Sequence, residues 1–268
     1  MKKIILLLTI FISMIGCTNL ENNDRNYGKI FAIYNVNDGL ISLDNQWKGA
    51  DLEKNQQLWN RVNEILPKSS NKFIKEFVIF SDGEFNVDAS MSPISGDNKT
   101  FKVYVDITDS FDENNKIKGK SLTYNIIHEY GHVLTLNHTQ FLKKKNKRSK
   151  TLTIGEGTLN ENSYLNQFYN KYWKEYYKEA QATIKMNDED EKYEIQTKFF
   201  EKHSDEFVTQ YAASELIEDI AESFAYFVMN DKPKDDSIKN NKILFFYNYE
   251  EMIQIRDEIR NSIKDLLY

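Results

Sequence analysis

The stretch L-T-Y-N-I-I-H-E-Y-G-H-V-L-T-L, residues 122–136, decides which fold we expect for this chain. It predicts a helix, on which His128 and His132 stand four residues apart. Residues at this spacing project from one face of a helix, so both imidazoles can reach a single metal ion. Glu129 follows the first histidine directly and therefore points in a different direction. The pattern H-E-x-x-H thus indicates a metal centre with a carboxylate beside it.

Zinc is the ion that suits this arrangement best. It takes two imidazoles plus one carboxylate or imidazole, and a fourth position stays open for water. Glu129 can reach that water as a general base, which is the chemistry of a zinc hydrolase. The chain has only four histidines, so two of them around a glutamate at this spacing would be a rare accident. We predict one zinc per chain; a helix that carries the three residues without binding metal is the alternative.

The third ligand distinguishes two classes of peptidase. The spacing H-E-x-x-H-x-x-T-x-x-H resembles the metzincin peptidases, whose third ligand is the last histidine, here His138. Metzincins have a glycine at the position of Thr135, which lets the helix end and turn, whereas a β-branched threonine is poorly suited to a left-handed turn. If the helix continues, His138 lies about 15 Å along the axis from His128 and cannot bind the same ion. Met186 also lacks the context of the metzincin methionine turn. We expect His138 at a helix end or on the surface, with the metzincin arrangement as the alternative.

A second candidate for the third ligand lies in the segment F-V-T-Q-Y-A-A-S-E-L-I-E-D-I-A-E-S-F-A-Y-F-V, residues 207–228. Glu218 and Glu222 are four residues apart there and are bordered by apolar residues. Two carboxylates in such surroundings are costly unless they are paired or bound to metal. A partly exposed face with two solvated glutamates is the alternative. Because the histidine pair needs one more ligand, we predict that Glu218 completes the metal site.

These two blocks together resemble the gluzincin peptidases of the anthrax lethal factor type, and a broad group of exported bacterial zinc metallopeptidases. In that family the first glutamate of an E-x-x-A-E helix binds zinc and the second braces a zinc histidine. The resemblance implies these roles for Glu218 and Glu222, and implies that Tyr211, seven residues before the ligand, faces the scissile carbonyl. It also implies a zincin-like fold. The long stretch from His138 to Phe207 is expected to be an insertion that shapes the cleft.

The remaining patterns predict an α+β architecture. The first third of the chain is mostly sheet, and the second half is mostly helical, with the active-site cleft between them. We expect one zincin-like metallopeptidase domain over residues 28–268. A helix over 51–66 begins with Asp51 as N-cap and stops at Pro67. Strands are expected over 28–36, 73–80 and 101–107.

Three segments carry further expectations. Apolar and polar residues alternate over 101–107, which predicts a half-buried strand, and its V-Y-V-D part could be the edge that aligns a peptide. The aromatic helix 162–180 is expected to pack in the core, and a substrate-lining role is the alternative. A last helix is expected from Glu250 to Leu267.

The N-terminus predicts export and lipid anchoring. Two lysines, an apolar run too short to span a membrane, and M-I-G-C indicate a lipoprotein signal peptide over residues 1–16. Cys17 would be acylated after cleavage, and residues 17–27 would tether the domain outside the bacterial cell membrane. Because Cys17 is the only cysteine, an intramolecular disulfide is impossible. An ordinary secretory signal with an incidental cysteine is the alternative.

The net charge of the chain limits which binding partners we expect. The formal net charge of −6 becomes −8 when Lys2 and Lys3 leave with the signal peptide, which argues against nucleic acid as a partner. The basic run 142–150 is expected to be a solvated loop, or, alternatively, a contact with anionic lipid. We expect a monomer whose partners are a protein or peptide substrate and the membrane. The alternative function is that of a surface binding lipoprotein that has a zincin scaffold but no catalytic activity. The presence of both Glu129 and Tyr211 argues against it, because a protein that has lost catalysis would be expected to lose one of them.

Overall fold

The computed structural model describes residues 28–44, 47, 50–83, 87–143, 150–184 and 188–267. The predicted signal peptide, Cys17, the tether, Met186 and most of the basic run lie outside the described residues. Among those that are described, no helix has both the length and the apolar character needed to cross a membrane.

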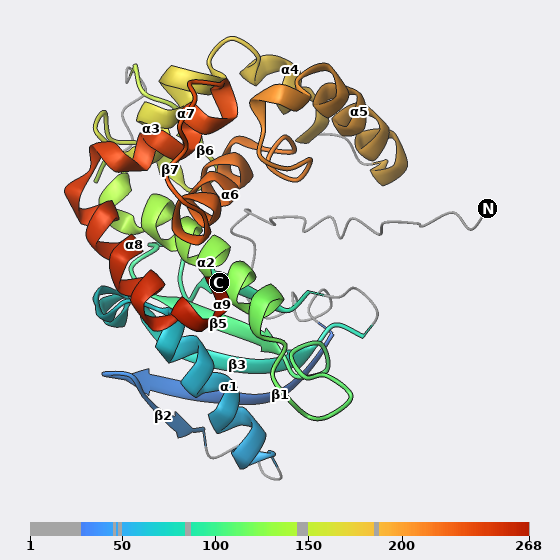
Figure 1. Ribbon diagram of the computed structural model, residues 1–268, viewed down its shortest axis with the longest axis vertical. Coiled ribbons are helices and arrows are strands. Elements are labelled where there is room, and N and C mark those ends of the chain that lie inside the picture. The colour runs from blue at the N-terminus through green and yellow to red at the C-terminus, as the bar shows by residue number, and fades with distance from the viewer. Residues whose placement is uncertain are drawn as a thin grey trace.

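A five-stranded mixed sheet forms one end of the molecule (Figure 1). Its order is β2-β1-β3-β5-β4; β3 and β5 run parallel, and the other pairs are antiparallel. The three predicted strands are confirmed as β1, β3 and β5, and two strands were not predicted, β2 and β4. The bounds are β1 Lys29–Asn37, β2 Leu40–Leu43, β3 Ile74–Ser81, β4 Ala89–Pro93 and β5 Phe101–Asp106.

The prediction of a half-buried strand over 101–107 is wrong. Val103 and Val105 of β5 belong to the main core, but Tyr104 on the opposite face is also buried, in a smaller cluster with Val78 and Phe80. The reason is that β5 is paired on both sides and packed on both faces, as central parallel strands are. The expectation that V-Y-V-D forms a sheet edge is wrong for the same reason, because β4 is the edge strand beside it.

Two helices join the sheet to the rest of the molecule. In α1, Leu52–Ile65, the side chain of Asp51 accepts from the backbone N of Lys54 at 3.1 Å, as predicted for an N-cap. The helix α2, Gly119–Leu136, runs between the sheet and the remaining helices (Figure 1). Apolar residues of both helices and of the sheet share one core.

The helical half of the chain is less regular than predicted. A small hairpin, β6 (Thr153–Ile154) and β7 (Gly157–Thr158), interrupts it. The aromatic segment is not one helix; it divides into α3, a π-helical turn η4, and α4. Its buried residues Phe168 and Trp173 lie in the core, which confirms the packing role. The bounds are α3 Tyr164–Phe168, η4 Tyr169–Trp173 and α4 Tyr177–Ile184.

Of the remaining helices, α3 and α6 pack against α2. The most important for the site is α6, Leu216–Met229, which packs against α2 (Figure 1). The predicted last helix is two helices, α8 and α9. The bounds are α5 Glu189–Lys202, α7 Ile238–Phe245, α8 Glu250–Ser262 and α9 Lys264–Leu267. With 51% helix, 18% strand and a mixed sheet, the chain has the α+β architecture that its patterns predict.

Candidate metal centre

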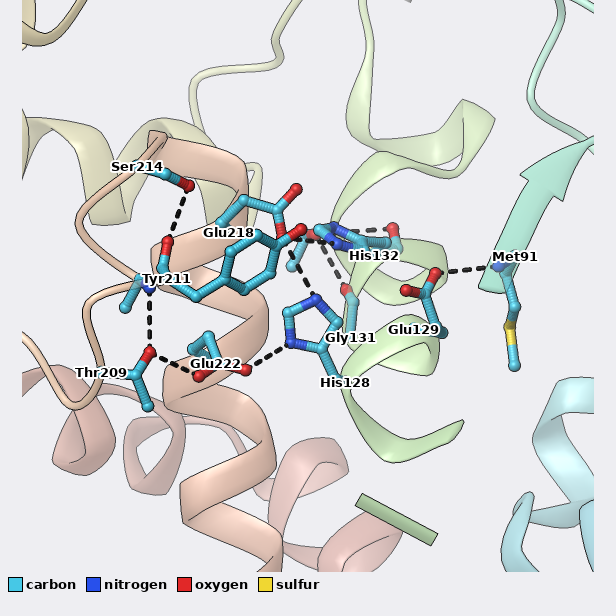
Figure 2. A network of polar contacts seen from close by, with 12 residues as sticks. Met91, His128, Glu129, Gly131, His132, Thr209, Tyr211, Ser214, Glu218 and Glu222 are labelled. Atoms are coloured by element: carbon cyan, nitrogen blue, oxygen red, sulfur yellow. Dashed lines mark hydrogen bonds and ion pairs between the residues drawn. The ribbon is translucent and has the colours of Figure 1, made fainter. Parts of the chain in front are cut away.

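The two histidines of the H-E-x-x-H pattern lie on the face of α2 that meets α6 (Figure 2). Their ring centroids are 4.9 Å apart and their planes are nearly perpendicular. His128 is buried, and the side chain of His132 is only 15% exposed. Gly131 stands between them, where the absence of a side chain lets α6 approach closely. The helix therefore presents both imidazoles to one small space.

Glu218, in the first turn of α6, lies opposite both imidazoles. Its Oε2 is 3.2 Å from His128 Nε2 and 3.3 Å from His132 Nε2. Hydrogen bonds between nitrogen and oxygen are usually shorter, near about 2.9 Å. Two ligand atoms on a tetrahedral zinc with bonds of 2.0–2.1 Å are separated by about 3.3 Å. Both distances from the Glu218 oxygen to the imidazole nitrogens are therefore close to the separation of two ligands on one small ion, and two imidazoles with a carboxylate are a donor set that zinc accepts.

Glu222, one turn further along α6, lies behind His128. Its Oε1 is 2.8 Å from His128 Nδ1 and accepts from the hydroxyl of Tyr124 at 2.9 Å. Its Oε2 accepts from the hydroxyl of Thr209 at 2.6 Å. With Nδ1 engaged by Glu222, His128 directs Nε2 toward Glu218, which is the orientation that a metal ligand needs. Nδ1 of His132 is buried and has no such partner within the described part of the chain.

Glu129 points away from α6 toward the sheet. Its Oε2 accepts from the backbone N of Met91 on β4 at 2.8 Å. One donor atom from each of His128, Glu129 and His132 lies within 4.8 Å of the others, so the three residues form a group that could hold a metal. Burial raises the pKa of the Glu129 carboxyl, and His132 and His128 oppose that rise. A carboxylate with a raised pKa beside a metal site is suited to proton transfer near neutral pH.

Tyr211 lies in the loop that leads into α6. Its ring centroid is 5.7 Å from that of His128, so the phenol lies beside the histidine pair. Burial and the nearby carboxylates hold the pKa of Tyr211 well above its ordinary value, so the phenol keeps its proton. The loop is held in place because the backbone N of Ala212 donates to Thr209 Oγ1 at 2.9 Å, and Ser214 Oγ donates to the Tyr211 carbonyl at 2.7 Å.

The buried acids and imidazoles shift each other's pKa. Burial alone would raise the pKa of Glu218, but the charge of His132 and hydrogen bonds from both imidazoles hold it below its ordinary value. Burial disfavours the charged form of His128, yet hydrogen bonds to Glu218 and Glu222 raise its pKa to about 10. Without a metal, His128 is therefore protonated at neutral pH, and a cation that binds there must displace a proton.

His138 lies apart from this group. The helix α2 ends at Leu136, and His138 is an exposed residue that begins the 3-10 turn η3, His138–Gln140. Thr135 remains helical, with its hydroxyl donating to the Gly131 carbonyl at 2.9 Å, so the turn that the metzincin arrangement requires does not form there. His138 thus lies at a helix end and on the surface, as predicted.

Sequence patterns missed several residues of this centre. Tyr124 could have been found, because Tyr124, His128 and His132 follow one another at spacings of four on the same helix face. Thr209 lies in a loop, and no pattern links it to Glu222. Met91 belongs to β4, which was not predicted, so its contact with Glu129 could not be foreseen.

A second group of carboxylates, Asp82, Asp106 and Asp109, lies at the ends of β3 and β5. Asp106 is fully buried, and its oxygens accept from the backbone N atoms of Asp82, Thr108 and Asp109 at 2.6 to 3.0 Å. These three hydrogen bonds compensate the burial of the Asp106 carboxylate. Asp106 therefore has a structural role, since it fixes the turn after β5.

Comparisons of the chain with protein-family models, with curated proteins and with solved structures give no match. What the centre can do is therefore inferred from its own residues.

Proposed function

We propose that the protein is a zinc-dependent peptidase of the gluzincin type with a zincin-like fold, in which His128, His132 and Glu218 bind the ion. One observation carries the proposal: a single oxygen of Glu218 lies 3.2 and 3.3 Å from the two imidazole nitrogens, on a helix about ninety residues away in sequence. Folding brings together two neutral donors and one anionic donor, which is a common ligand set of catalytic zinc sites.

The residues around these ligands have complementary roles in hydrolysis. A bound zinc ion supplies Lewis-acid activation of a water molecule. Glu129 accepts the proton of that water as it attacks the peptide carbonyl, and later delivers a proton to the leaving amine. The phenol of Tyr211, which keeps its proton, is able to donate a hydrogen bond to the developing oxyanion. Glu222 keeps His128 in the tautomer whose Nε2 faces the ion.

The edge strand β4 is the proposed guide for an extended peptide. Asp88 O and Ile94 N are hydrogen-bonded toward β5 and its loop, so the alternating residues Ala89 and Met91 direct their backbone groups to the free edge. The backbone N of Met91 already contacts Glu129, which places this edge beside the general base. A substrate strand added to β4 would thus bring its carbonyl toward the centre.

Export and lipid anchoring through Cys17 remain part of the proposal. They rest on the signal-like N-terminal residues and on the small residue before the cysteine. A peptidase tethered in this way would act on peptides or proteins outside the cell.

Glu129→Gln tests the proposal. This variant should keep one zinc per chain, because Glu129 is not one of the three proposed ligands, and should lose cleavage of a diverse peptide library. Glu113→Gln, a variant of an exposed loop residue, is the matched control and should cleave like the wild type. Cleavage that persists in Glu129→Gln would exclude the mechanism. A zinc-loaded wild type that cleaves no peptide would instead favour a non-catalytic binding protein.

A further inference from the structure

Thr209 connects the loop that carries Tyr211 to Glu222, the carboxylate behind the proposed ligand His128 (Figure 2). Its hydroxyl donates to Glu222 Oε2 at 2.6 Å and accepts from the backbone N of Ala212 at 2.9 Å. The first bond reaches helix α6, and the second closes the turn that contains Tyr211. Because a hydroxyl has one proton to donate and lone pairs to accept with, Thr209 uses both capacities here.

Glu222 carries this connection on to the metal centre. Its other oxygen, Oε1, is 2.8 Å from His128 Nδ1, and the residue is only 4% exposed. Its orientation is therefore set by protein donors rather than by solvent. A continuous path of hydrogen bonds runs from the backbone N of Ala212 through Thr209 and Glu222 to the imidazole. Tyr211 lies between the two loop residues of this path, directly before Ala212 in the sequence.

The same loop has a second attachment, on the side of α5. Gln210 Nε2 donates to Thr197 Oγ1 at 3.2 Å, and Gln196 Nε2 donates to the Ser214 carbonyl at 3.5 Å. Both bonds are longer than those of Thr209. They reach a helix that bears none of the three proposed ligands, so they hold the loop without relating it to the histidines.

The position of Tyr211 matters for its proposed role. An oxyanion donor must lie within hydrogen-bond reach of the reacting oxygen, and a displacement of about 1 Å can lower a rate about a hundredfold. A threonine that only closed its own turn would need the bond from Ala212 and not the bond to Glu222. We propose, on the basis of the peptidase function above, that Thr209 is a positioning residue: through Glu222 it fixes the phenol of Tyr211 relative to the zinc site.

Three substitutions of Thr209 test this role in the zinc-loaded protein. Thr209→Val keeps the shape but loses both hydrogen bonds, Thr209→Cys has only a weak donor and acceptor, and Thr209→Ser keeps the hydroxyl. On a fluorogenic peptide, kcat should fall about tenfold to hundredfold in Thr209→Val, less in Thr209→Cys and least in Thr209→Ser. KM should stay the same, because the bond to the oxyanion forms only in the transition state. Thr197→Val loses the bond from α5 to the same loop, so it is the matched control and should cleave like the wild type.

Two further measurements separate positioning from a general effect on folding. In a Tyr211→Phe background, Thr209→Val should lower kcat by less than about threefold, because the phenol that Thr209 positions is already gone. Zinc affinity, measured by competition with a chromophoric chelator, requires no substrate. Thr209→Val should bind zinc about tenfold more weakly, since Glu222 loses one of its donors, and Thr197→Val should bind it like the wild type.

The results distinguish a failure of this role from a failure of the peptidase function. A wild-type kcat in Thr209→Val, a similar loss in Thr197→Val, or a full loss in the Tyr211→Phe background would overturn the role while peptidase activity stands. Wild-type zinc affinity in Thr209→Val would overturn it too, because Glu222 would then not depend on Thr209. If Thr209→Val does not fold, equal kcat values in the wild type, Thr209→Ser and Thr209→Cys would overturn it. If the wild type binds zinc but cleaves no peptide, the peptidase function fails, and this inference fails with it.

Discussion

Gly131 on α2 lies against the backbone of Ala221 on α6, so closely that a Cβ on Gly131 would be 3.2 Å from Ala221 Cα. The same Cβ would be 3.2 Å from the ring of Phe224. This contact lies beside His132 on one helix and within one turn of Glu218 and Glu222 on the other. It therefore sets the separation between the imidazoles and the carboxylates that face them.

Gly131→Ala should weaken zinc binding by about tenfold or more, because α6 has to move away from α2 and a packed helix backbone yields at a cost of about 1–3 kcal/mol. Competitive titration of zinc with a chromophoric chelator measures the change. Gly119→Ala is the matched control at the start of α2, where the added Cβ would meet only the flexible end of Leu266 at 3.2 Å. Wild-type affinity in Gly131→Ala would contradict this view of the helix contact.

Glu218→Ala should lose the zinc, and His138→Ala should retain it. Only the first substitution removes a donor atom from the buried centre, since His138 is exposed beyond the end of α2. Metal content after dialysis against a dilute chelator distinguishes the two variants. If His138→Ala loses zinc and Glu218→Ala keeps it, the third ligand is His138, as in the metzincin arrangement.

Tyr124→Phe should lower zinc affinity by about tenfold to hundredfold, as removal of groups that orient a ligand does. The phenol donates to Glu222 at 2.9 Å, and Glu222 in turn orients His128. Tyr249→Phe loses a comparable hydrogen bond, to Gln167 at 3.0 Å, far from the centre. Isothermal titration with zinc should therefore separate two variants that are similar in stability. Equal affinities would show that Tyr124 has no part in orienting the ligands.

The half of the site on α2 could be predicted from sequence because its information is local. Two histidines at a spacing of four must share a helix face, whatever surrounds the helix. The meeting of Glu218 with these histidines is a tertiary contact across ninety residues, and only the apolar context of two glutamates, together with the family resemblance, indicated it.

The errors have equally specific causes. The strand β4 has the sequence A-S-M-S-P, which is short and has no β-branched or aromatic residue, so it is recognised as a strand only by its pairing with β5. The aromatic segment 162–180 contains no glycine or proline that would predict a break in its helix. The break coincides with Trp173, whose indole N–H donates to buried Asp219 at 2.7 Å, so a distant partner overrides local helix propensity.

The zinc-free protein should lose stability as the pH rises from 6.5 toward 10. Although burial opposes it, hydrogen bonds to Glu218 and Glu222 raise the pKa of His128 from 6.5 to about 10 in the folded state. Its contribution to stability is therefore complete below pH 6.5 and is lost through that interval, by at most about 1.4 kcal/mol per pH unit. Glu218, with a lowered pKa, contributes above its unfolded value of 4.5 and adds no loss at high pH.

Urea unfolding of the zinc-free protein at pH 6.5 and pH 9 measures this dependence. His138→Gln should behave like the wild type, whereas His128→Gln should lack the loss of stability between these two pH values. A wild-type stability that is flat over this range would mean that His128 is not protonated in the folded metal-free protein.

Lys242→Met should destabilise the protein by about 3–5 kcal/mol, the usual cost of breaking a buried ion pair by removing one partner. Lys242 and Asp219 are both fully buried, with Nζ 2.7 Å from Oδ2, and Asp219 follows the proposed ligand Glu218 directly. The ammonium group also lies 3.6 Å from the centre of the Phe207 ring.

The double variant Asp219→Asn/Lys242→Met should be more stable than Lys242→Met alone. It leaves no unpaired charge, and the asparagine carbonyl can still accept from the indole of Trp173. Urea unfolding of the two single variants and the double variant forms a mutant cycle. If the double variant is as unstable as the sum of the singles, the two side chains are not coupled. The pair then has no part in fixing the first turn of α6, where Glu218 meets the two histidines.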